Sequence, residues 1–193
     1  CPLTQDRHLL KNSIDDIEQP MGGTNFWDSL RYVLAILNAS GSSLRRSAVV
    51  VMTDGVDNAL PGVFGEGSLT GFDQLLRLVR ASEAIVFPIY LDTEDEEYKR
   101  HRTPRSAFAI AREQLGQLAV ACGTRLYRAN ELKDLDDVYK QVIGDLGRIY
   151  SIGYRPSNTS RDGKWRSVNV QVSDRQDVTA RTKEGYYSRS VAN

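Results

Sequence analysis

Two short segments of the chain carry residue types that could bind a divalent cation. Gly22-Gly23-Thr24-Asn25 precedes an expected helix, and Thr53-Asp54-Gly55 ends an expected strand about thirty residues later. A hydroxyl and a carboxylate are hard oxygen donors, which Mg²⁺ and Mn²⁺ prefer. Alone, Thr24 is best interpreted as a helix N-cap and Asp54 as a residue that caps its loop. Their conjunction on the expected elements favours a metal site formed by Thr24 and Asp54.

Other polar residues offer weaker alternatives. His8 and His101 lie among polar residues with no acidic or cysteine partner at ligand spacing, so we expect exposed side chains. Asp57-Asn58 could supply outer oxygens to a cation, but a turn is the better interpretation. The acidic run 92–97 suggests weak cation binding, with a solvated loop as the preferred alternative. Cys122 is expected to be a small buried residue. No nucleophile and base pair is evident.

Composition restricts the class of protein. The 193 residues suffice for one domain with an appendage. The 25 basic and 25 acidic residues cancel, so no overall field attracts nucleic acid or an anionic membrane. No apolar run approaches the roughly 20 residues that span a bilayer. Two cysteines make neither a disulfide framework nor a metal-ligand spacing.

The spacing of apolar residues predicts the elements that position Thr24 and Asp54. Helical spacing predicts helices over 6–17, 25–38, 72–84, 104–122 and 132–146. β-branched and apolar runs predict strands over 47–52, 85–91 and 124–128, and the first of these has the composition of a strand buried on both faces. This alternation is typical of an α/β, doubly wound, mostly parallel sheet. We therefore expect Thr24 and Asp54 on adjacent loops at the carboxyl edge of that sheet.

The period changes after residue 147. Alternating or β-forming residues over 149–155, 165–173 and 178–183, with a turn signal at Asp162-Gly163, predict an antiparallel meander. We interpret 148–193 as a C-terminal β extension of the same domain, and 1–147 as its main part.

Two sequence pairs resemble a known family. GGTNFWDSL together with AVVVMTDGVDN resembles the metal-ion-dependent adhesion site of von Willebrand factor A (VWA) domains, and the segment from IYSIGYRPSNTS to KEGYYS is similar to the end of bacterial VWA-related proteins common in acidobacteria. The resemblance implies a Rossmann-like fold, Mg²⁺ or Mn²⁺ held by Thr24 and Asp54, and no enzymatic activity. It also implies a protein or peptide partner offering a carboxylate, and a location outside the cytoplasm.

The chain departs from the family in one respect. The family's Asp-x-Ser-x-Ser motif does not occur before Thr24, and residues 1–4 are similar to the end of the family's third strand. We expect a VWA fold truncated at its N-terminus, with an incomplete metal site. In the family's strand order, 3-2-1-4-5-6, the strand at 47–52 then becomes an exposed edge that favours self-association.

Two alternative functions remain open. An aspartate after a buried strand also occurs in Mg²⁺-dependent phosphohydrolases, and the glycine-rich stretch 65–71 could cradle a phosphate. That stretch lacks the Lys-Ser/Thr pair of a P-loop. The second alternative is a structural scaffold whose metal site is degenerate.

Overall fold

The computed structural model describes residues 4–18, 22–39, 47–175 and 177–190. Most of the expected strand end at residues 1–4 lies outside these ranges. The elements, in chain order, are α1 (Arg7–Asp15), α2 (Phe26–Ala39), β1 (Ala48–Thr53), α3 (Phe72–Ala81), β2 (Ile85–Leu91), α4 (Glu94–His101), α5 (Arg105–Cys122), β3 (Tyr127–Ala129), the short 3-10 helix η1 (Leu132–Asp134), α6 (Leu135–Leu146), β4 (Trp165–Ser167) and β5 (Gly185–Tyr187). All five predicted helices form, and the predicted strand over 85–91 is confirmed residue for residue.

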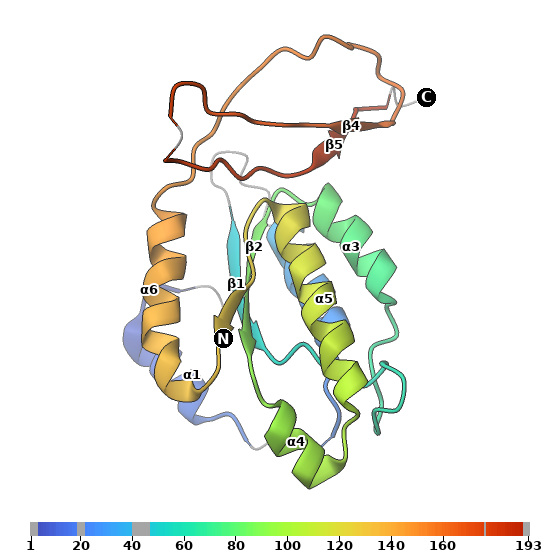
Figure 1. The fold of residues 1–193 in the computed structure, drawn as a ribbon, viewed down its shortest axis with the longest axis vertical. Coiled ribbons are helices and arrows are strands. Elements are labelled where there is room, and N and C mark those ends of the chain that lie inside the picture. The colour runs from blue at the N-terminus through green and yellow to red at the C-terminus, as the bar shows by residue number, and fades with distance from the viewer. Residues whose placement is uncertain (1–3, 19–21, 40–46, 176, 191–193) are drawn as a thin grey trace.

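The main sheet has three parallel strands in the order β1-β2-β3. Helices cover both of its faces (Figure 1). One core joins α2, α3 and α5 to one face of the sheet, with Leu34, Leu75 and Phe108 among its buried side chains. A smaller core packs α6 against the opposite face through Val138 and Val142. The chain is therefore a mixed α/β protein with a parallel sheet, as predicted.

Strand β1 lies at the edge of the sheet within the described residues. Its side chains alternate between a face packed on the core and an exposed face. Val49 and Val51 pack against the larger core, whereas Val50 and Met52 are 41% and 42% exposed. The prediction that both faces of this strand are buried was thus wrong. Helix α6 covers β2 and β3 but leaves Val50 and Met52 of β1 exposed. The predicted edge position is confirmed.

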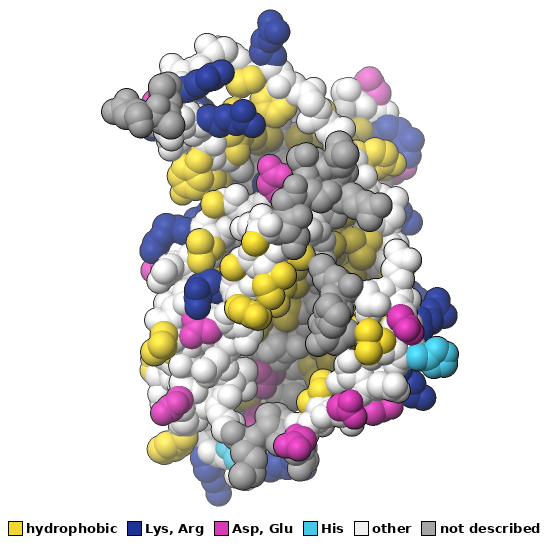
Figure 2. Space-filling model, turned by 180° about the vertical axis from the view of Figure 1, so that it is seen from behind, with side chains coloured by type: hydrophobic (Ala, Val, Ile, Leu, Met, Phe, Trp, Pro, Cys, Tyr) yellow, Lys and Arg dark blue, Asp and Glu magenta, His cyan; other side chains and the backbone are white. Residues whose placement is uncertain are grey.

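Apolar side chains also remain exposed on the neighbouring helices. Helix α1 forms at its predicted place, but none of its residues is buried, and Ile14 is 65% exposed. Helix α2 exposes Tyr32 and Ile36. Figure 2 shows this side of the molecule, where apolar side chains are gathered over α2. Within the described residues, no helix combines the length and the apolar character needed to cross a membrane.

The acidic segment after β2 begins helix α4, so the solvated loop preferred for the run 92–97 is wrong. Its first turn is acidic from Glu94 to Glu97, and its last turn is basic from Lys99 to His101. Negative charge at the start of a helix and positive charge at its end both interact favourably with the helix dipole. Ion pairs one turn apart, Glu96–Arg100 and Glu97–His101, add to its stability.

The C-terminal segment forms less strand than predicted. Among the described residues of this segment, β4 and β5 pair antiparallel and an isolated bridge joins Asp162 to Ser190. Trp165 packs edge-to-face on Tyr187 with ring centroids 4.9 Å apart. The stretches 149–155 and 178–183 form no strand. Gly163 adopts the left-handed conformation expected of a turn residue, with φ of 69°. The meander is therefore wrong in extent, and the predicted tight turn at Asp162-Gly163 does not form, because Asp162 instead makes an isolated antiparallel bridge with Ser190.

This C-terminal segment is docked at the amino end of the parallel sheet, away from α4 (Figure 1). The Arg80 guanidinium pairs with Glu184 at 3.0 Å, and the Lys183 ammonium donates to the Ser82 carbonyl. Gly123, at the end of α5, has φ of 70°, and a Cβ there would lie 2.4 Å from the carbonyl carbon of Thr182. The close approach of Thr182 therefore depends on a glycine at position 123.

Candidate functional site

Asp54 stands directly after β1, at the carboxyl end of the parallel sheet. The chain turns sharply here, because the Thr53 hydroxyl accepts a hydrogen bond from Gly55 N at 2.9 Å and Asp54 Oδ1 accepts one from Val56 N at 3.0 Å. Gly55 has φ of 74°, a conformation that favours glycine. This turn holds the Asp54 carboxylate half-buried at the sheet edge.

The loop of Thr24 lies against the loop of Asp54. Thr24 N donates to Asn58 Oδ1 at 2.7 Å, and Asn58 N donates to the Thr24 carbonyl at 2.9 Å. The two predicted ligands therefore occupy adjacent loops. Their side chains are not hydrogen-bonded to each other in the described structure, and Thr24 is exposed while Asp54 is half-buried.

Sequence reasoning missed Thr93, which follows β2. Its hydroxyl donates to Asp54 Oδ2 at 2.9 Å, so two strand ends meet at this carboxylate. The signal was present, since Asp92-Thr93 follows a buried apolar strand just as Asp54 follows β1. Burial raises the pKa of Asp54 above its ordinary value, and the hydrogen bonds from Val56 N and Thr93 oppose that rise.

Asp54 has no basic partner among the described residues, and the charge acting on it comes from Glu97. A half-buried carboxylate without a counter-charge fits a cation by the chemistry of its oxygens. The hydroxyls of Thr24 and Thr93 fit the same ion by type. The described residues contain no group of three or more His, Cys, Asp or Glu arranged as metal ligands. The oxygen atoms at this site are therefore of the type that a hard cation prefers, but there are few of them.

Asp57 and Asn58 have structural roles, in agreement with the turn interpretation. The Asp57 side chain is fully buried, and its carboxylate accepts hydrogen bonds from Trp27 N, Ala59 N, Ser68 N and the Ser68 hydroxyl. It thereby caps α2 from a different loop. Asn58 joins the Thr24 loop and also donates to the Phe64 carbonyl. Both residues hold the loops around the site in place.

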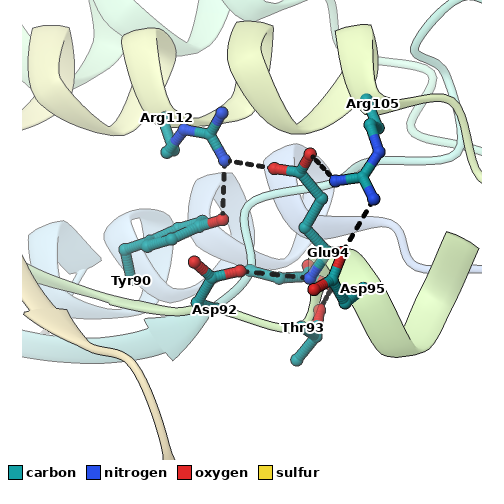
Figure 3. A network of polar contacts seen from close by, with 8 residues as sticks. Tyr90, Asp92, Thr93, Glu94, Asp95, Arg105 and Arg112 are labelled. Carbon is teal, nitrogen blue, oxygen red and sulfur yellow. Dashed lines mark hydrogen bonds and ion pairs between the residues drawn. The ribbon is translucent and has the colours of Figure 1, made fainter.

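Two acidic residues of α4, Glu94 and Asp95, pair with arginines of α5 (Figure 3). Arg112 donates to Glu94 at 2.8 Å and to the Tyr90 hydroxyl at 3.0 Å, while Arg105 bridges Glu94 and Asp95. The hydrogen bond from Arg112 lowers the pKa of Glu94. These pairs anchor α4 beside the sheet and leave its carboxylates poorly suited to hold a cation.

A cleft of about 580 Å³ opens at the carboxyl ends of β2 and β3. Thr93, which contacts Asp54, contributes to its wall, and so do Leu91, Asp92, Asp95, Glu96, Asn130, Glu131 and Leu132. Three of its four carboxylates are paired, with Arg105, Arg100 and Lys133. The candidate site thus borders an open space large enough for part of a ligand.

The exposure expected of His8 and His101 is confirmed. The expectation that His101 has no acidic partner was wrong, because its Nδ1 lies 2.8 Å from Glu97 Oε2 one helical turn earlier. Cys122 is buried, and burial raises the pKa of its thiol. No family model, curated protein or solved structure matches this chain.

Proposed function

We propose that the chain is a non-enzymatic, metal-ion-dependent binding module of the VWA type. Asp54 and Thr24 hold Mg²⁺ or Mn²⁺, and the bound ion receives a carboxylate from a protein or peptide partner. The observation that carries this proposal is the half-buried Asp54 carboxylate at the carboxyl edge of the sheet, adjacent to the Thr24 loop and, in the part of the chain that the structure describes, without a basic partner.

The topology supports the same proposal. In the family's sheet order the fourth, fifth and sixth strands lie side by side and parallel, and β1, β2 and β3 have that arrangement. Asp54 then follows the strand that corresponds to the fourth. The antiparallel pair β4–β5 corresponds to the C-terminal part of the bacterial resemblance.

The chemistry of the cation determines the class of partner. A hard divalent ion held by one carboxylate and neutral hydroxyls keeps a net charge of about +1 and several positions for water. A partner's carboxylate replaces a water and neutralises that charge. Nucleic acid is not expected, because basic and acidic residues are equal in number. A location outside the cytoplasm follows from the resemblance alone.

Paramagnetic NMR with Mn²⁺ tests the proposal at the weak affinity expected of so few ligands, a Kd of roughly 1 mM. We expect Mn²⁺ to broaden the amide signals of Thr24, Asp54 and Thr93 first, and excess Mg²⁺ to restore them. Asp54→Ala should abolish this localised broadening. Asp95→Ala, which removes an arginine-paired carboxylate at the same edge, should leave it intact.

The alternatives give different results. A scaffold with a degenerate site gives no localised broadening, and broadening that persists after Asp54→Ala places the ion elsewhere. Asp54-dependent hydrolysis of p-nitrophenyl phosphate in Mg²⁺ would replace the binding module with a phosphohydrolase. Tight metal binding by this chain would contradict the small ligand set.

A further inference from the structure

An open pocket of about 340 Å³ lies between helix α3 and the β4–β5 pair. Its wall is formed by Arg80, Trp165, Ser167, Glu184 and Tyr187. Strands β4 and β5 lie beside the end of α3 that carries Arg80 (Figure 1). The pocket is therefore at the amino end of the parallel sheet, opposite to Asp54, and its volume is in the range of small-molecule sites, about 300–1,000 Å³.

The aromatic part of the wall is held in a fixed geometry. Trp165 and Tyr187 are directly opposite each other in the β4–β5 ladder, and their rings meet edge-to-face with centroids 4.9 Å apart. A Cβ on Gly185 would stand 2.7 Å from the Trp165 indole, so the indole lies close against the backbone of β5. Tyr187 is 47% exposed. A ligand therefore meets an aromatic surface that it does not have to order.

The polar part of the wall is an ion pair with unused hydrogen-bonding capacity. Arg80 Nε and Nη2 both donate to Glu184 Oε2, at 3.3 Å and 3.0 Å. Within the described residues, Glu184 Oε1 and Arg80 Nη1 have no hydrogen-bond partner, and neither does the Ser167 hydroxyl. The same ion pair thus offers one acceptor and one donor to a ligand.

The charges of the wall indicate an uncharged ligand. Arg80 and Glu184 are its charged residues, and they neutralise each other. Of their charged neighbours along the chain, Arg166 pairs with Asp162, and the Lys183 ammonium donates to a backbone carbonyl. An ion of either sign would have to compete with the partner already present in the Arg80–Glu184 pair. A neutral ligand with hydroxyl groups uses the open donor and acceptor and leaves the pair intact.

The shape of the aromatic wall restricts the ligand further. The planes of the two rings are inclined at 67°, so they form no parallel slot for a flat heterocycle. A sugar ring is puckered, has apolar C–H groups on its faces, and carries hydroxyls around its rim that both donate and accept. It therefore combines the apolar face and the paired polar groups that this wall requires.

We propose that this pocket binds a carbohydrate. One sugar ring packs its C–H face on Trp165 and Tyr187. Arg80 Nη1 donates to one of its hydroxyls, and a neighbouring hydroxyl donates to Glu184 Oε1. This inference goes beyond the proposed function and does not rest on it, because Asp54 lies at the other end of the parallel sheet.

Disaccharide binding followed through the indole N–H signals in two-dimensional NMR tests the proposal. The chain has two tryptophans, and Trp27, which is 6% exposed, serves as the internal reference for Trp165. Cellobiose, maltose and N,N′-diacetylchitobiose are titrated separately against the full chain. We expect at least one of them to shift the Trp165 signal and leave that of Trp27 in place. The Kd should be on the order of 1–10 mM, because the few contacts of an open site only modestly exceed the cost of association.

Two variants and a matched control locate the ligand. Tyr187→Ser removes one aromatic ring and should weaken binding roughly tenfold or more. Ser167→Leu fills part of the pocket, removes neither ring and should also weaken binding. Tyr150→Ser is the control, because Tyr150 is 80% exposed in the same C-terminal segment and does not line the pocket, so affinity should be unchanged. Melting temperatures within a few degrees of wild type would show that each variant is folded.

The possible results differ clearly. If no disaccharide shifts the Trp165 signal, the proposal is wrong. If adenosine, tetramethylammonium or inorganic phosphate shifts it and no disaccharide does, the pocket takes another class of ligand and the proposal is again wrong. Equal disaccharide affinity in wild type, Tyr187→Ser and Ser167→Leu would place the ligand elsewhere. Asp54→Ala should leave disaccharide binding unchanged, so these results are independent of the metal site.

Discussion

Replacing Asp57 with alanine should cost more stability than replacing any other single carboxylate discussed above. The Asp57 side chain is fully buried, and its two oxygens accept four hydrogen bonds. The donors are Trp27 N at 3.0 Å, Ala59 N at 2.9 Å, Ser68 N at 2.9 Å and the Ser68 hydroxyl at 2.6 Å. These bonds tie the start of α2 to both ends of the β1–α3 loop.

The magnitude follows from the donors left behind. Loss of the cap on α2 costs about 1 kcal/mol. Each buried donor without an acceptor costs about 1–3 kcal/mol, and water entering the vacated space recovers part of this. We therefore expect Asp57→Ala to lower the free energy of unfolding by about 3–5 kcal/mol, at the upper end of single substitutions. With a urea m value of about 2 kcal/mol/M, the midpoint falls by about 2 M.

Urea unfolding followed by far-UV circular dichroism measures this loss. Asp73→Ala is the control, because Asp73 is an exposed carboxylate in the first turn of α3 and its removal should cost about 0.3–1 kcal/mol. Asp57→Asn should fall between the two, since one acceptor oxygen remains and an NH₂ group faces backbone donors. A loss below about 1 kcal/mol for Asp57→Ala, or one equal to that of Asp73→Ala, would refute the assignment of these bonds.

Three further predictions concern other parts of the molecule. In α5, Gly116→Ala places its new methyl group in open space and should raise the free energy of unfolding by about 0.5–1 kcal/mol. Gly123→Ala should lower it by about 2 kcal/mol, because residue 123 has a positive φ and lies against Thr182. Equal melting temperatures for the two variants would contradict this. In chelator near pH 7, Asp54→Asn should have a higher melting temperature than wild type, because burial raises the pKa of Asp54 and its charged form destabilises the fold. The difference in melting temperature should shrink as the pH falls toward the ordinary pKa of 3.8. A difference that grows as the pH falls would contradict this reasoning. We expect this chain to self-associate through the β1 edge, and Val50→Lys to shift it toward monomer in sedimentation velocity with little loss of stability; a monomeric wild type would contradict the edge hypothesis.

The interior of the main sheet and its covering helices followed from local pattern. The run Ile85–Leu91 is apolar throughout. A run of this kind, bounded by polar residues, is typical of a strand buried on both faces of a parallel sheet. The helices were predicted because their apolar residues recur at steps of three and four, which is a property of each segment alone. Where a segment's own residues decide its structure, the prediction agreed with the structure.

Helix α4 and the C-terminal segment were predicted wrongly for opposite reasons. The composition of α4 is that of a solvated loop, and the ion pairs that anchor it use Arg105 and Arg112 of the next helix. The stretches 149–155 and 178–183 have β-forming residues, but a strand requires a partner in register, and among the described residues of this segment the only strands so paired are β4 and β5. In α4, ion pairs within the helix and with the next helix overrode the expectation of a loop, whereas the two C-terminal stretches lack a paired strand.

For the candidate site too, some features were predictable from the sequence and others were not. The sequence by itself indicated that Thr24 lies just before a helix, that Asp54 lies just after a strand, and that parallel topology brings such loops to one edge of a sheet. Only the tertiary structure decided that Thr93 donates to Asp54 while Asp57 is fully buried beneath α2. The physical reason is that a carboxylate's role depends on which donors and charges surround it, and some of these lie far along the chain, Thr93 39 positions from Asp54 and Trp27 30 positions from Asp57.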